Sequence, residues 1–195
     1  MGVIVKEFDP VSVKNSHVQF KNSDGTYAPG TDFGFIGTIS GETVLIEVIK
    51  RKEGFEAGKK VKPQKMTLNL TGRVYASVLR DIFGIKSDGL KPGVYSYGTD
   101  SIGKEFIFTA DEIDDFEEVT KLTAYMNCRT ASGLTVSIEN GASEVAEISL
   151  TLECYPDDQG QIKYEAFVSE LDDTTVSQQW HSAFTRELVE AVPTP

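Results

Sequence analysis

The residues that could support catalysis are few and widely separated. The two histidines, His17 and His181, stand near opposite ends of the chain, where we expect terminal arms. Nucleophilic catalysis needs a base beside a serine or cysteine, and no serine-hydrolase, zinc-protease, phosphate-loop or dinucleotide motif occurs. A carboxylate-pair hydrolase stays open, because thirty acidic residues offer many pairs. We expect no enzyme, no catalytic residue and no cofactor.

Metal-binding patterns are equally weak. Cys128 and Cys154 are distant in the sequence, whereas a zinc site needs clustered ligands. Each cysteine ends a strand-like segment, so a bridge between neighbouring strands is geometrically possible and the sequence leaves their redox state open. Residues 111–118 carry six carboxylates in eight positions. They lack the spaced ligands and central glycine of a calcium loop, and we interpret them as a solvated turn.

The composition is that of a globular protein with one core. The chain has 195 residues, 39% hydrophobic and 25% charged, which suits a single domain with added arms. No apolar run approaches the roughly 20 residues of a membrane-spanning helix. The first residues lack the basic start and apolar stretch of a secretory signal. We expect no membrane partner.

The charge is negative and unevenly distributed. Thirty acidic and nineteen basic residues give a net charge of −11, which disfavours gripping DNA by its phosphates. Residues 1–100 hold 14 basic and 11 acidic side chains, whereas residues 101–195 hold 5 and 19. The asymmetry suits head-to-tail association of copies. A plain solvated acidic surface explains it as well.

Turn signals and periodicity divide the chain into three parts. Residues 1–33 are polar and turn-rich, and we expect an irregular N-terminal arm. Residues 34–169 form the domain, with β-branched and alternating strands and one helix at 72–83, capped by Thr71 and stopped by Gly84. The pattern predicts a mainly β fold, an antiparallel β-sandwich or partial barrel with one flanking α-helix.

A basic segment interrupts the strands at residues 50–62. We predict a long exposed loop there, because glycines punctuate it at 54 and 58, and long loops of this kind are usually functional. Phe55 is an apolar residue without a local reason to be there. The loop either contacts a neighbouring subunit or is a flexible segment with one incidental aromatic residue. The proposed contact residues are Lys50, Arg51, Lys52, Phe55, Lys59 and Lys60.

Residues 170–195 form a C-terminal segment. Trp180, Phe184 and Leu188 are four residues apart, which is typical of an amphipathic helix. This segment either docks on a neighbouring subunit, as a C-terminal arm, or folds onto its own domain. Both possibilities stay open at this stage.

The order of these features resembles the major tail tube proteins of long-tailed bacteriophages and related prophages. The resemblance covers residues 34–169. It rests on the strand end Leu68-Asn69-Leu70-Thr71-Gly72, the helix with its Gly84 stop, Gly93-Val94-Tyr95, Tyr125-Met126-Asn127-Cys128, the run 139–147, Tyr155-Pro156-Asp157-Asp158 and Lys163-Tyr164-Glu165-Ala166.

The resemblance implies a structural virion protein of the tail, assembled in the host cytoplasm. Copies would form rings, as hexamers, that stack into a hollow tube and contact tape-measure and tail-terminator or tail-tip proteins. Genome DNA would pass through without specific binding. An acidic wall would repel phosphates, and our residues for that wall are Thr135, Ser137, Glu139, Glu147, Ser149, Thr151 and Glu153. Ordinary solvent exposure explains them equally well.

A second class of function is a monomeric β-sandwich module that binds a sugar or peptide. Such a module needs exposed aromatic side chains on a sheet face. The available set is Tyr95, Tyr97 and Tyr125.

Overall fold

The computed structural model of the chain describes residues 4–141 and 145–191. The strands are β1 (Ser12–Phe20), β2 (Thr31–Asp32), β3 (Gly34–Lys52), β4 (Phe55–Val74), β5 (Phe106–Asp114), β6 (Val119–Thr130), β7 (Ile148–Cys154) and β8 (Lys163–Phe167). The helices are α1 (Ala76–Phe83), η1 (Val168–Glu170), α2 (Thr174–Gln179) and α3 (Arg186–Val189). Within these residues no helix is long and apolar enough to cross a membrane.

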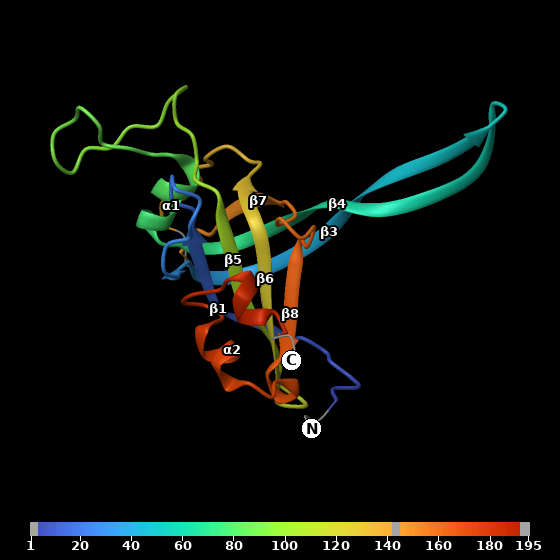
Figure 1. The fold of residues 1–195 in the computed structure, drawn as a ribbon. Helices are drawn as coiled ribbons and strands as arrows, with labels where there is room; N and C mark the ends of the chain where they lie inside the picture. Colours follow the sequence, from blue (N-terminus) through green and yellow to red (C-terminus); the bar gives the residue numbers. More distant parts are fainter. Residues whose placement is uncertain (1–3, 142–144, 192–195) are drawn as a thin grey trace.

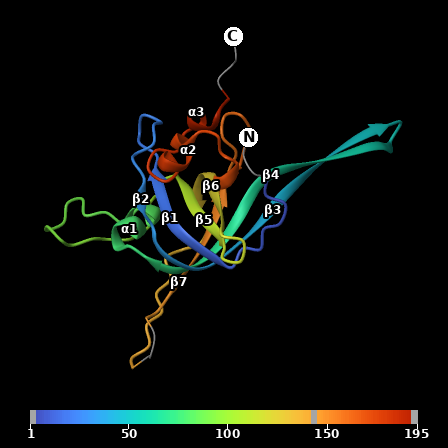
Figure 2. The same ribbon diagram turned by 90° about the horizontal axis from the view of Figure 1, so that it is seen from below.

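One open antiparallel sheet dominates the molecule. Its strand order is β2-β1-β5-β6-β7-β4-β3, and β8 pairs with the other part of β6. Figures 1 and 2 show the sheet curving strongly, with α1 at one side and the C-terminal helices against one face. The predicted class, mainly β and antiparallel with a flanking helix, is confirmed.

Two hydrophobic clusters hold the sheet. The larger one packs α1, through Val78, Ile82 and Phe83, against the inward side chains of the strands. Alternation on β7 supplies Leu150, Leu152 and Cys154 to this core. The second cluster lies beneath the C-terminal helices. The apolar faces of the sheet within the body of the domain are thereby covered.

The helix is shorter than the sequence predicts. It begins at Ala76, after Tyr75 at the N-cap position, because Val74 still pairs in the β4 ladder. Thr71 is therefore a strand residue and not the cap. Gly84 ends the helix in the left-handed conformation (φ 66°), as expected, and donates its N–H to the carbonyl of Arg80.

The predicted N-terminal arm is wrong for residues 12–33. β1 lies inside the sheet between β2 and β5, and Val18 and Phe33 are fully buried. The segment looked irregular because buried polar residues interrupt its pattern. Ser16 and Gln19 are both buried but hydrogen-bonded, to the carbonyl of Gly34 and to the backbone of Phe184.

The first three residues expected in the acidic wall, Thr135, Ser137 and Glu139, do not lie in a strand. Residues 131–141 form no strand and leave the body of the domain as an extension, together with residues 145–147 (Figure 2). Val136 and Ile138 alternate as in a strand but are exposed, so they have no core to bury against. Thr135, Ser137 and Glu139 therefore lie outside the sheet.

Candidate assembly surface

The β3–β4 hairpin extends far beyond the domain (Figure 1). Its ladder runs from Gly34↔Val74 to Lys52↔Phe55, so the predicted loop at 50–62 is in fact paired strand. The turn is only Glu53-Gly54, with φ of 52° and 85°, which matches the type I′ turn favoured in two-residue hairpins. The glycines at 54 and 58 had suggested a loop. Gly54 serves the turn, and Gly58 pairs with Lys50.

The hairpin has two faces of different chemistry. Opposed residues share a face, so the alternation on β3 and the register separate the two sides. The side chains on one face, here called the lysine face, are apolar or basic, whereas Glu47 and Lys59 form an ion pair on the other. The lysine face consists of Ile46, Val48, Lys50, Lys52, Phe55, Lys60 and Lys62.

Exposed apolar side chains accompany these charges. Phe55 at the tip is 80% exposed, and Ile46 and Val48 are about half exposed. The other face exposes Leu45, Ile49 and Val61. A long hairpin with apolar side chains on both faces and an unpaired outer edge is typical of a surface that another protein covers.

The lysine face continues into a polar face on the body of the sheet. Thr67, Asn69 and Thr71 of β4 stand opposite Glu153, Thr151 and Ser149 of β7. The Thr151 hydroxyl donates to Asn69 Oδ1 at 3.0 Å, and Lys65 pairs with Glu153 at 2.5 Å. Three of the proposed lumen residues thus share one face. It carries mainly hydroxyl and amide groups instead of the expected row of carboxylates.

The C-terminal segment folds onto its own domain. Trp180 and Phe184 are buried, with ring centroids 4.8 Å apart, against Ile107, Leu122 and Met126. The indole N–H donates to the Thr123 carbonyl at 3.1 Å. The expected C-terminal arm contact of Trp180, Phe184 and Leu188 with a neighbour is therefore wrong, since the four-residue spacing faces the chain's own sheet.

The two histidines meet, although the sequence placed them in separate arms. Their ring centroids are 5.1 Å apart. His181 Nε2 lies 2.8 Å from Asp111 Oδ1, and its Nδ1 lies 2.9 Å from Thr109 Oγ1. Thr109 and Asp111 are buried, so this network joins the C-terminal segment to β5 in the interior of the domain. No local pattern in the sequence indicates this contact.

The acidic run at 111–118 divides between structure and surface. Asp114 is buried and accepts N–H groups from Asp9, Phe116 and Glu117 at 2.9, 2.9 and 3.2 Å, and these bonds lower the pKa of its carboxyl. Asp115–Glu118 form the exposed β5–β6 turn. The expected solvated turn is thus limited to these four residues. Across residues 4–141 and 145–191 no cluster of three metal-binding side chains occurs.

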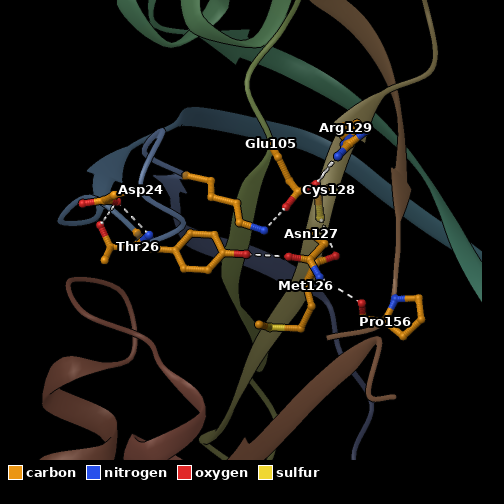
Figure 3. A network of polar contacts seen from close by, with 10 residues as sticks. Asp24, Thr26, Glu105, Met126, Asn127, Cys128, Arg129 and Pro156 are labelled. Carbon is orange, nitrogen blue, oxygen red and sulfur yellow. Dashed lines mark hydrogen bonds and ion pairs between the residues drawn. The ribbon is translucent and has the colours of Figure 1, made fainter. Parts of the chain in front are cut away.

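A cleft of about 810 Å³ lies between the β1–β2 loop, β6 and the C-terminal segment. Figure 3 shows its polar wall, where the Tyr27 hydroxyl donates to Asn127 and the Asn127 amide donates to the Pro156 carbonyl. Beside it Glu105 pairs with Lys21 and Arg129.

Tyr125 is buried, and burial raises its pKa. The proposed platform of Tyr95, Tyr97 and Tyr125 therefore does not exist as one surface.

The cysteines are opposed in the β6–β7 ladder, fully buried, with their sulfur atoms 2.9 Å apart. Burial raises the pKa of the Cys128 thiol, which suppresses its thiolate. We predict that reduced, folded protein reacts with Ellman's reagent on the order of a hundredfold more slowly than unfolded protein. The matched control is Ser87→Cys, which adds an exposed thiol that should react at once. Rapid titration of both native thiols would contradict the packing.

No protein-family model and no curated protein matches the chain. The chain is similar to one in the cryo-EM structure of the anti-feeding prophage cap, the tube-terminating cap, with TM-score 0.45 and 10% identity over 84% of this chain and 95% of that one. A chain of the anti-feeding prophage baseplate, 6-fold symmetrised, gives 0.40 and 11% over 83% and 97%.

Proposed function

We propose that this protein is a structural component of a phage tail or a related particle, and specifically the subunit that polymerises into its tube. In this proposal copies associate into rings, six to a ring, and the rings stack. The chain acts without catalysis or cofactor. Its partners are further copies and other tail proteins such as the tape measure and the terminator or tip. Its location is the virion tail, after assembly in the host cytoplasm.

The observation that carries the proposal is the unfinished edge of the sheet. β3 is 19 residues long and ends the strand order, so among the described strands its outer edge has no partner. An edge of this length, with apolar side chains on the hairpin, is an aggregation hazard in a monomer. Closing several copies into a ring gives each edge a partner and limits the assembly to a defined size.

The polar face supports the same proposal. A conduit for DNA should present few cations, because lysines and arginines would bind the phosphates. The face made by Thr67, Asn69, Thr71, Ser149 and Thr151 offers hydroxyl and amide groups. Lys65 and Glu153 neutralise each other there, so the charge that remains is the negative one of Glu42 opposite Thr67. We assign this face to the lumen in place of the acidic wall expected from the sequence.

The decisive experiment is negative-stain electron microscopy of the purified full-length chain, alone and after addition of sheared tails as nuclei. We expect hollow tubes or rings of uniform diameter. A protein that stays monomeric under both conditions overturns the proposal. In that event the monomeric binding module becomes the better hypothesis. Titration of the protein with sugars or peptides, which would bind in the cleft beside Tyr27, tests it.

A further inference from the structure

We propose that the lysine face of the hairpin binds the β5–β6 turn of a second copy of this chain. The inference rests on the proposed function and adds to it the identity of the surface that receives the hairpin. Both the lysine face and the β5–β6 turn are exposed. The lysine face is basic and the turn is acidic, and the two lie far apart within one molecule.

The lysine face is a surface built for an anionic partner with an apolar centre. Lys50, Lys52, Lys60 and Lys62 lie on it beside Ile46 and Val48, and no carboxylate shares the face. Ion pairs within the described chain involve none of these four lysines, whereas Lys59 on the opposite face is neutralised by Glu47. The four ammonium groups are therefore available to pair with the carboxylates of an external partner.

The β5–β6 turn has the complementary composition. Asp115, Glu117 and Glu118 flank Phe116, which is 80% exposed. Ion pairs among residues 4–141 and 145–191 use none of the three carboxylates. The carboxylate of the neighbouring Asp114 accepts hydrogen bonds from the backbone N–H groups of Phe116 and Glu117. These two bonds restrain the turn, which reduces the conformational entropy lost when it docks.

The two features cannot meet within one molecule. The hairpin leaves the sheet at one end, and the β5–β6 turn lies at the opposite end, where Asp9 contacts Asp114 (Figure 1). A contact between them must therefore join two copies, head to tail. Because donor and acceptor surfaces differ, each copy can give its hairpin to one neighbour and receive that of another, which propagates an assembly. Phe116 would pack against Ile46 and Val48 while the carboxylates face the lysines.

The test is a charge swap. One variant carries Lys50→Glu, Lys52→Glu and Lys60→Glu, a second carries Asp115→Lys, Glu117→Lys and Glu118→Lys, and a third combines all six changes. The critical concentration for assembly, measured by pelleting, should rise at least about tenfold in the first two variants, because like charges then face each other. It should return close to the wild-type value in the combined variant. Added salt should weaken wild-type assembly.

The matched control reverses three exposed lysines outside the hairpin, Lys6→Glu, Lys14→Glu and Lys91→Glu, and should assemble normally. Wild-type protein that assembles while neither reversal alters it overturns the docking but leaves the tube proposal standing. Two impaired variants without recovery in the combined one also overturn the pairing. If the lysine variant assembles normally but loses retention of duplex DNA, the face serves nucleic acid. Wild-type protein that never assembles overturns both proposals.

Discussion

Replacing Trp180 with alanine should destabilise the protein by about 3–5 kcal/mol, as truncation of a buried aromatic residue does elsewhere. The side chain is 1% exposed and lies at the centre of the second cluster. Its loss opens a cavity under the C-terminal helices and leaves the Thr123 carbonyl without its indole donor. For a chain of this size the melting temperature should fall on the order of 10 °C. Far-UV circular dichroism during urea and thermal unfolding measures both quantities.

Two further variants separate packing from hydrogen bonding. Trp180→Phe keeps most of the apolar contact and removes the N–H donor, so it should cost only about 1–3 kcal/mol. Leu188→Ala, at the margin of the same cluster, should cost less than Trp180→Ala. An unchanged unfolding midpoint in Trp180→Ala would show that the C-terminal segment does not stabilise its own domain. The segment would then be better described as an arm that is free to bind a neighbouring subunit.

Removing the hairpin should abolish assembly while the domain stays folded. Thr43 and Met66 are opposed in the β3–β4 ladder, so an Asn-Gly turn can join them in place of residues 44–65. None of the replaced residues is buried. The free energy of unfolding should therefore change by no more than about 1 kcal/mol. Sedimentation velocity should show a monomer, and microscopy should show no tubes even with sheared tails present.

The control for this deletion keeps the hairpin and alters its tip alone. Phe55→Ser removes the exposed aromatic side chain but leaves the Glu53-Gly54 turn, and we expect tubes of lower stability. Tubes of normal yield from the deleted protein would exclude the hairpin from the assembly contact. A deletion that unfolds the domain would contradict the view that residues 44–65 lie outside its core.

The sequence predicted the elements whose periodicity reflects their own burial. Leu150 and Leu152 alternate with Ser149 and Thr151 because one face of β7 meets the core, and the resulting β class is confirmed. The helix and its Gly84 stop were readable for the same reason. The hairpin was not, because an exposed strand has no buried face and its lysines and glycines resemble those of a loop.

The sequence located the basic segment but did not predict its conformation, and its role as a contact surface stays a prediction. Lys50, Arg51, Lys52, Phe55, Lys59 and Lys60 do lie together at the end of the hairpin, although as strands and not as a loop. The four-residue spacing of Trp180, Phe184 and Leu188 suggested one amphipathic helix, but α2 ends at Gln179 and α3 begins at Arg186. The spacing also could not show what covers these side chains. Contacts such as that of His181 with Asp111 join distant parts of the sequence, and such pairs leave no local pattern.

The two ends of the chain meet late in synthesis, and this sets an order of events for a newly made subunit. Gln19 binds the backbone of Phe184 across 165 positions, and Gly30 donates its N–H to the Ser182 carbonyl. The β3–β4 hairpin, by contrast, pairs strands that are neighbours in the sequence, so it can form soon after it leaves the ribosome. A nascent chain thus exposes the hairpin that we propose to bind neighbouring copies well before the last residues complete the domain. If that proposal holds, nascent chains on one polysome can associate prematurely.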